Sequence, residues 1–178
     1  MSFFGQVRQL GYVVKDLEAA MTYWRDVMGV GPFFHFENAP VGDFKYYGVE
    51  TDAKISLALA NCGDMQIELI QPRDDKPSPY RDFLNEGREG LQHLAFWSET
   101  FDADLAHAQT AGFKVILSGY AVQEDGLFAY FDDTAAPQPG VMVELSALTG
   151  AKKETFAMIK EKSLTWDGKI PVQRMDAG

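Results

Sequence analysis

Cysteine is nearly absent from this sequence, since Cys62 is the only one among 178 residues. An intramolecular disulfide is therefore excluded, and we expect a protein of the reducing cytoplasm. Long hydrophobic runs are also missing: no stretch of 18 or more apolar residues occurs, so we expect no membrane span. The opening Met-Ser-Phe-Phe-Gly has no basic segment before an apolar one, which argues against a signal peptide.

Basic residues are scarce as well. The chain has 16 Lys and Arg against 26 Asp and Glu, a formal net charge of −10. Nucleic-acid binding requires a basic face, so this class of partner is excluded. A small anionic substrate stays compatible with the composition, because a metal ion or a local patch can reverse the sign of the charge inside one pocket. The length fits one domain, or two small fused modules that share a core.

The first half of the chain alternates strand-like and helix-like segments. Residues 7–14 are rich in β-branched and aromatic side chains, which is typical of a strand. Asp16 is a suitable N-cap for a helix that ends at Gly29. Further strand-like segments follow at 31–38, 43–49, 54–60 and 65–71, with a predicted hairpin turn at 61–64 between the last two.

The second half repeats this order. A strand is predicted at 91–97 and a helix at 101–111, which Gly112 ends. Aligning Gln9 with His93 brings the helix-ending glycines and two strand glutamates of the halves close to register. The glycines Gly29 and Gly112 lie 20 and 19 residues downstream, and the glutamates Glu68 and Glu144 lie 59 and 51 residues downstream. Two copies of a βαβββ unit explain these spacings, and longer loops at 38–43 and 50–54 would account for the greater length of the first copy.

Four polar residues, Gln9, Glu68, His93 and Glu144, fall at matching places in the two copies. Strand alternation puts each on a face with small or apolar neighbours, opposite a face that can pack on a helix. A carboxylate or imidazole on such a face is costly to bury unless it is paired or bound to metal. One histidine with carboxylate and amide oxygens suits one divalent ion such as Zn, Mn, Co, Ni or Mg.

Each of these residues also has an ordinary interpretation. A single glutamate in a strand usually faces solvent, and a lone strand histidine is more often a satisfied structural residue than a ligand. The glutamine alone indicates almost nothing. Their symmetric placement in a duplicated unit is what favours the metal site.

Four separated stretches carry a family resemblance. They are Gln-Leu-Gly-Tyr-Val-Val-Lys-Asp-Leu-Glu-Ala-Ala (9–20), Gln-Ile-Glu-Leu-Ile-Gln-Pro (66–72), Gly-Leu-Gln-His-Leu-Ala-Phe (90–96) and Val-Met-Val-Glu-Leu (141–145). In order and spacing they resemble the vicinal-oxygen-chelate superfamily of glyoxalases, epimerases, ring-cleaving dioxygenases and antibiotic-resistance proteins. The resemblance implies a homodimer and an α+β fold, in which two βαβββ modules form a U-shaped half-barrel sheet around one cleft and its metal. It places one domain at 5–150 (module one about 5–72, a linker helix about 78–87, module two about 90–148) and a C-terminal helix and extended arm at 151–178.

Within the superfamily the chain most resembles methylmalonyl-CoA epimerase-like members. The Glu-Leu-Ile-Gln-Pro run, the Ser-Pro-Tyr-Arg-Asp-Phe-Leu linker and the Gly-Leu-Gln-His element carry this likeness. Gln9 stands where epimerases usually have histidine, as in zinc-type glyoxalase I, whose ligands are Gln, Glu, His and Glu. The second base of epimerases has no secure counterpart, and Glu37 and Glu50 are the candidates. Ring-cleaving iron dioxygenases use two histidines, but His35 and His107 lie outside the ligand strands, so that chemistry is not expected.

The function that the resemblance implies is that of a divalent-metal-dependent isomerase or lyase. Such an enzyme abstracts a proton next to a carbonyl held at the metal, and the substrate would be an acyl thioester or an α-oxo compound. Glu144 would be both ligand and base, with Gln9, Glu68 and His93 as further ligands. Aromatic side chains that could line the pocket, or simply belong to the core, are Tyr46, Tyr47, Trp97, Phe128 and Tyr130.

Two other functions stay open at this point. A metal-free protein could sequester a hydrophobic small molecule in the same cleft, which pairing of Glu68 with a basic side chain would favour. An interaction module could have its cleft covered by a partner, which threading of the arm 163–178 into the cleft would favour. The tail begins with a helix that we predict to be exposed, over Lys152–Lys162.

Overall fold

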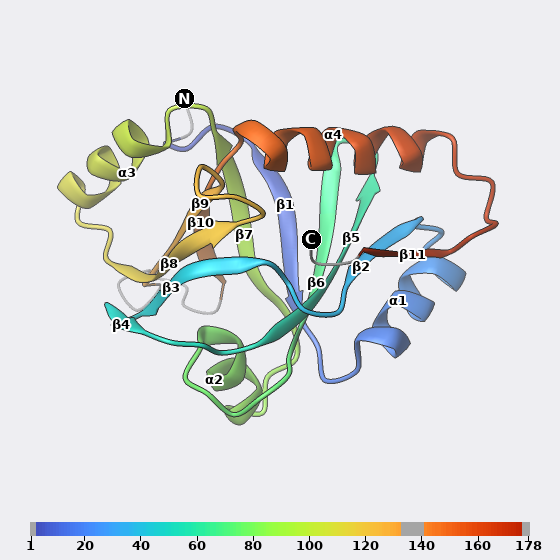
Figure 1. Cartoon of the computed structure of the whole chain (residues 1–178), viewed down its shortest axis with the longest axis horizontal. Coiled ribbons are helices and arrows are strands. Elements are labelled where there is room, and N and C mark those ends of the chain that lie inside the picture. The colour runs from blue at the N-terminus through green and yellow to red at the C-terminus, as the bar shows by residue number, and fades with distance from the viewer. Residues whose placement is uncertain (1–2, 133–140, 176–178) are drawn as a thin grey trace.

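The computed structural model describes residues 3–132 and 141–175. Within them, eleven strands form one sheet that curls into a half-barrel, in the order β11-β2-β5-β6-β1-β7-β10-β9-β8-β3-β4 (Figure 1). The predicted α+β half-barrel is confirmed. The strands are β1 (Val7–Val13), β2 (Phe33–Phe36), β3 (Val41–Tyr46), β4 (Val49–Glu50), β5 (Ile55–Cys62), β6 (Met65–Pro72), β7 (Gly90–Ser98), β8 (Val115–Ala121), β9 (Leu127–Phe131), β10 (Met142–Ala147) and β11 (Val172–Met175). The helices are α1 (Leu17–Asp26), α2 (Pro79–Asn85), α3 (Phe101–Thr110) and α4 (Gly150–Leu164).

Local sequence signals determine several boundaries as predicted. The Asp16 carboxylate accepts a hydrogen bond from the backbone N–H of Ala19 at 2.9 Å and caps α1. Ser78 caps α2 in the same way, and Pro79 is the first residue of that helix. In the hairpin between β5 and β6, Gly63 adopts a φ of 61°, a backbone conformation that glycine accepts without strain.

The two copies meet at the centre of the sheet. β1 and β7 pair antiparallel, β6 lies parallel to β1, and β10 lies parallel to β7. The four strands on which the predicted ligands lie are therefore neighbours. Gly11 on β1 is opposite Glu68 on one side and His93 on the other, which brings the two copies' polar residues to adjacent strands.

Strand alternation decides which residues face the helices. Ile67 and Leu69 on β6 belong to a core cluster with α1, and Leu145 and Ala147 on β10 belong to one with α3. Because successive strand residues point to opposite faces, the residues between them line the concave face. Figure 1 shows α1 and α3 on opposite flanks of the half-barrel, while α4 crosses one end of the central strands and α2 lies at the other end.

The extra length of the first copy has a different structure from the predicted longer loops. β3 and β4 form a hairpin that leaves its own module, and β3 pairs antiparallel with β8 of the second module. Tyr46, for example, lies opposite Leu117. The predicted strand at 43–49 exists in shifted form, but its partner lies in the other copy. No local pattern specifies this pairing, because it depends on which sheet edge is free.

The prediction of an exposed helix over Lys152–Lys162 was wrong in one respect. The helix α4 is present, but one of its faces packs on the sheet and buries Lys152 and Ile159, while Phe156 contacts Trp97 with ring centroids 5.0 Å apart. A lysine in the buried face hides this burial from the sequence, because lysine usually indicates exposure.

The extended arm adds a strand to the sheet. In the described part of the chain, β11 pairs parallel with β2, so this segment lies at the sheet edge rather than in the cleft. Residues 133–140, within the predicted second module, and 176–178, at the end of the predicted arm, lie outside the described residues. None of the helices in the described ranges has the length and apolar composition needed to cross a bilayer.

Candidate metal centre

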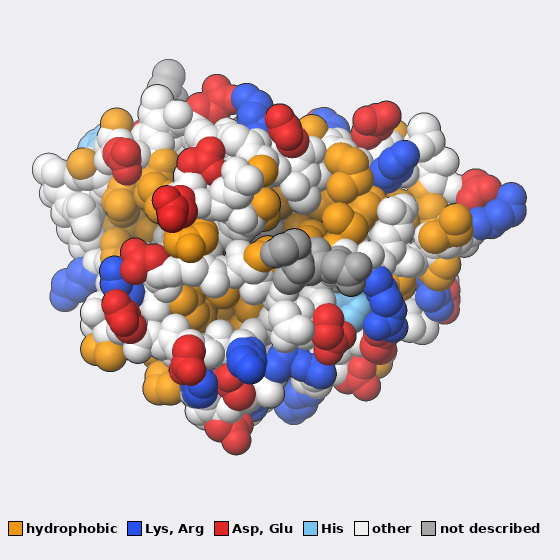
Figure 2. Space-filling model, in the orientation of Figure 1, with side chains coloured by type: hydrophobic (Ala, Val, Ile, Leu, Met, Phe, Trp, Pro, Cys, Tyr) orange, Lys and Arg blue, Asp and Glu red, His pale blue; other side chains and the backbone are white. Residues whose placement is uncertain are grey.

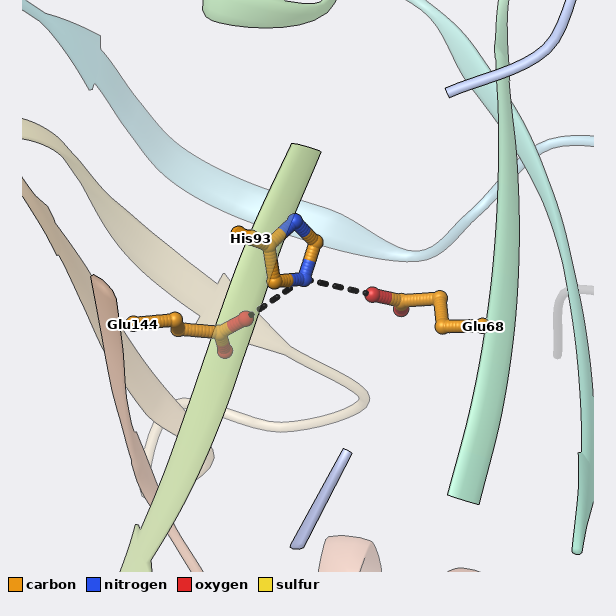
Figure 3. A group of neighbouring side chains, drawn as sticks. All are labelled: Glu68, His93 and Glu144. Carbon is orange, nitrogen blue, oxygen red and sulfur yellow. Dashed lines mark ion pairs between the residues drawn. The ribbon is translucent and has the colours of Figure 1, made fainter. Parts of the chain in front are cut away.

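Three of the four predicted ligands converge on one point. The Nε2 atom of His93 lies 3.2 Å from Oε2 of Glu68 and 3.2 Å from Oε2 of Glu144 (Figure 3). The ligand atoms of all three residues lie within 4.8 Å of one another. His93 is fully buried and Glu144 is 5% exposed, so the group is nearly shielded from water.

Gln9, the fourth predicted ligand, lines the same cleft as Glu68 and Glu144. Its Nε2 donates a hydrogen bond to Oε1 of Gln66 at 2.7 Å, and the pair is buried. This bond involves the amide nitrogen of Gln9. It does not involve the amide oxygen, which is the atom that binds cations. The structure therefore brings His93 into contact with Glu68 and with Glu144, and it places Gln9 in the lining of the same cleft.

A glycine makes room for the imidazole. An added Cβ at Gly11 would lie 1.8 Å from Cε1 of His93, well inside any allowed contact. Gly11 on β1 thus leaves the space that the imidazole occupies, because the two residues lie directly opposite each other in the sheet.

The donor set fits a divalent cation. Bonds of about 2.1 Å to nitrogen and oxygen ligands put neighbouring ligand atoms roughly 3.0–3.4 Å apart. The two distances of 3.2 Å around Nε2 of His93 match this spacing. One imidazole, two carboxylates and one amide oxygen are ligands that Zn, Mn, Co, Ni and Mg accept.

Gln92, which was not among the predicted site residues, sets the tautomer of the histidine. Its Nε2 donates to the backbone carbonyl of Pro79 at 3.0 Å, so its Oε1 must be the atom 3.0 Å from Nδ1 of His93. An amide oxygen can only accept, so Nδ1 carries the hydrogen. In the neutral ring the free lone pair is then on Nε2, the nitrogen nearest both carboxylates. This is the tautomer that a metal ion held by Nε2 and the carboxylates requires.

A β-bulge brings Gln92 to this position. Gly11 pairs with His93, but the next residue, Tyr12, pairs with Leu91, so Gln92 has no partner in β1. Strict alternation would point Gln92 and His93 to opposite faces, whereas a bulge allows neighbouring side chains to meet. The motif Gly-Leu-Gln-His contains the residue, but its spacing does not reveal the bulge.

Charge balance at the site is dominated by the histidine and its carboxylates. Burial alone would lower the pKa of His93, but hydrogen bonds to Glu144 and Glu68 and their charges outweigh it and raise the pKa to about 9. Burial alone would raise the pKa of Glu144, yet the bond to His93, its charge and that of Lys152 lower it. A proton on Nε2 and a metal ion are therefore alternatives that satisfy the same two carboxylates.

Two tyrosines complete the inner wall. The Tyr130 hydroxyl lies 3.3 Å from Nε2 of His93, and the Tyr80 hydroxyl donates to that of Tyr130 at 3.1 Å. Burial, together with the charges of the nearby glutamates, raises both pKa values. Both groups are neutral phenols at physiological pH. The O–H of Tyr80 is already donated to Tyr130, so the O–H of Tyr130 is the donor that lies beside His93.

The cleft above this centre is mainly apolar. Of the five aromatic residues predicted to line it, Phe128 and Tyr130 do so, whereas Tyr46, Tyr47 and Trp97 lie elsewhere. Figure 2 shows hydrophobic side chains in patches beside α4 and along β3, surrounded by charged side chains. The aromatic residues that the sequence did not single out are Phe36, Tyr80 and Phe156.

The remaining candidates lie outside the cleft lining. Glu37 follows β2, is exposed and pairs with Arg73 at 3.1 Å, and Glu50 is exposed on β4. Neither lines the cleft, so the structure gives no support to either as a second base. His35 is buried on β2 and His107 is exposed on α3, away from the ligand strands as expected.

Comparisons with known proteins agree with this architecture. A sequence profile of the glyoxalase/bleomycin resistance protein/dioxygenase superfamily matches residues 8–131. The structure of methylmalonyl-CoA epimerase from Mycobacterium tuberculosis is similar over 87% of this chain and 95% of that one, with a TM-score of 0.61 and 19% identity. A hypothetical protein from Bacillus halodurans C-125 has the same TM-score at 16% identity, covering 82% of this chain and 95% of its own.

A third similar structure is a variant of Streptomyces coelicolor methylmalonyl-CoA epimerase in complex with 2-nitronate-propionyl-CoA. It covers 80% of this chain and 93% of its own, with a TM-score of 0.52 and 18% identity. No curated protein shows significant sequence similarity to the chain. At these identities the likeness to the solved structures shows the fold alone.

Proposed function

The chain belongs to the glyoxalase/bleomycin resistance protein/dioxygenase superfamily, the vicinal-oxygen-chelate proteins, and from that premise we propose that it is a divalent-metal-dependent isomerase or lyase. Its reaction abstracts a proton next to the carbonyl of an acyl thioester or α-oxo compound. The observation that carries the proposal is the convergence of Glu68, His93 and Glu144 at the inner end of an apolar cleft.

Each residue has a role that follows from its position. His93, Glu68 and Glu144, with Gln9, would hold the ion, which when bound polarises a carbonyl and stabilises the enolate by several kcal/mol. Glu144 presents one carboxylate oxygen to His93 and, as Figure 3 shows, directs the other away from it, where it can take up the proton. The apolar walls exclude water and strengthen these interactions.

Binding without a metal is the alternative function of the cleft. One feature predicted to favour it, pairing of Glu68 with a basic side chain, is present as the contact with Nε2 of His93 at 3.2 Å. Because His93 is itself a potential metal ligand, this contact fits both functions and does not decide between them. The second alternative, an interaction module, would be favoured by threading of the arm into the cleft. In the described part of the arm, β11 lies at the sheet edge instead.

The proposal is tested by elemental analysis of untagged protein, before and after chelation and re-addition of Zn, Mn, Co, Ni and Mg. We expect about one tightly held ion per chain. Carbonyl compounds are then screened with the loaded protein for exchange of α-protons in D2O, followed by NMR. Failure to hold any of the five ions would overturn the proposal and leave the cleft as a binding site for organic molecules.

Replacing Gln92 should weaken metal binding without removing a ligand. Gln92→Leu takes away the acceptor that fixes Nδ1–H of His93, and we expect affinity to fall about 10- to 100-fold. Gln92→Glu keeps an acceptor for Nδ1 but loses the donor to Pro79, so it should retain more affinity than Gln92→Leu. Metal affinity is measured by chelator competition. Equal losses in both variants would indicate that Gln92 only holds α2 in place.

Metal affinity should depend on pH well above the usual range of histidine. Because Nε2 of His93 must lose its proton to bind metal and its pKa is raised to about 9, affinity should increase as pH rises from 7 toward 9. One displaced proton corresponds to about tenfold per pH unit. Chelator competition at constant ionic strength measures this slope, and an affinity that is equal at pH 7 and 9 would show that no proton is displaced.

A further inference from the structure

A buried lysine from the C-terminal helix reaches the same cleft. Lys152 on α4 is only 4% exposed and lines the cleft together with Glu68 and Glu144. It is the one cationic side chain among the described residues that line it. The helix lies beyond residues 8–131, the part of the chain that the superfamily profile matches.

The ammonium group of Lys152 contacts neutral acceptors and aromatic rings, and one of these acceptors, Ser146, also hydrogen-bonds Glu144. Its Nζ donates to Oγ of Ser146 at 2.6 Å and to the carbonyl of Gly126 at 3.4 Å, and it lies 5.9 Å from the ring centroids of Phe128 and Phe156. Within the described residues it has no ion-pair partner.

Two other lysines of α4 do have ion-pair partners. Lys153 pairs with Glu99 at 2.5 Å and Lys160 pairs with Asp64 at 2.6 Å. Both of these lysines are solvent-accessible, so an unpaired charge would cost less there than at Lys152. A buried charge is costly unless it is paired. Burial lowers the pKa of Lys152, and the charges of Glu144 and Glu68 oppose this only in part. In the proposed enzyme the charges of these two glutamates are balanced by the metal ion.

The ammonium lies close to the metal centre along one strand. Ser146 follows Glu144 by two residues on the same face of β10, so the two side chains leave the strand about 6.6 Å apart. A ligand with its carbonyl at the metal therefore places a second group, a few bonds away, at Lys152 and Ser146.

We propose that Lys152 and Ser146 bind a carboxylate of the substrate, so that the substrate is an oxo-carboxylate with an apolar body. This rests on the proposed function for the role of the carbonyl. A carboxylate carries the single negative charge that one ammonium balances, whereas a phosphate dianion would call for further cations, which the described lining does not offer. The apolar body meets side chains such as Ile55, Leu57 and Ile70.

The test compares acids with their methyl esters on the metal-loaded protein by calorimetry. The probes are 2-oxopentanoate, 4-oxopentanoate, 5-oxohexanoate and 6-oxoheptanoate, in which the distance from carbonyl to carboxylate increases. We expect at least one acid to bind about 10- to 100-fold more tightly than its ester, the usual value of a charge-assisted hydrogen bond in a buried site. In Lys152→Met the ratio of acid affinity to ester affinity should fall to about one, because the cation that distinguishes the acid from the ester is gone.

Lys153→Met is the matched control, because it removes the neighbouring, outward-facing lysine of the same helix and should leave the preference unchanged. No preference for any acid in the unmodified protein overturns the inference, even if Lys152→Met does not fold. An unchanged preference in a folded Lys152→Met overturns it too. The proposed function is judged separately, by metal content and proton exchange. If the protein holds its ion and exchanges protons but binds ester and acid equally, only the carboxylate inference is overturned.

Discussion

Substituting His93 by alanine should abolish tight retention of a divalent ion. The change removes the single imidazole donor from a site whose other ligands are oxygens, and Nε2 is equidistant from both carboxylates. Loss of an outer partner of a ligand costs about 10- to 100-fold in metal affinity, so we expect loss of the ligand itself to exceed about 100-fold. The measurement is the metal content of untagged variant protein after dialysis.

His107→Ala is the control for this experiment, because His107 lies on α3 and packs against Phe3 rather than facing the cluster. We expect the His93 variant to keep its secondary structure but to be less stable than the parent in the presence of chelator. The reason is that Glu68 and Glu144 lose the group that compensates their buried charges. An unchanged metal stoichiometry in the His93 variant would remove this residue from the site.

The positions of the predicted ligands could be read from the sequence because two regular patterns specify them. Alternation along β6 and β10 separates Glu68 and Glu144 from the leucine and isoleucine side chains that pack on α1 and α3. Duplication then aligns Gln9 with His93, so the central strands of both copies carry a polar residue at matching places. These patterns are local or periodic, and the fold preserves them.

Features that depend on irregular or distant contacts could not be read in the same way. The bulge that turns Gln92 toward His93 breaks the alternation on which the prediction rested. The pairing of β3 with β8 depends on a free edge in the other module. Burial of Lys152 contradicts the usual preference of lysine, and only the packed position of α4 reveals that it reaches the cleft. Each of these features modifies the site that the regular pattern predicted.

Replacing Glu144 by glutamine should stop exchange of the substrate α-proton with D2O. Glutamine keeps an oxygen that can face the ion, but it cannot accept a proton at neutral pH, and removal of a general base typically costs about 100- to 10,000-fold. A substrate analogue should still bind, so calorimetry separates binding from proton transfer. Metal content must be measured in parallel, because Glu144 also contacts His93.

Glu68→Gln is the matched control for Glu144, since it makes the same change in the other copy of the unit. The two glutamates are each 3.2 Å from Nε2 of His93, but their surroundings differ. Glu144 is two residues from Ser146, and its charge raises the pKa of Lys152 more than that of Glu68 does, against the larger lowering by burial. If Glu144 is the base, metal-loaded Glu68→Gln should keep exchanging protons while Glu144→Gln does not. Exchange that persists in Glu144→Gln but disappears in Glu68→Gln would assign the base to Glu68, because these are the two acidic residues among the described lining of the cleft.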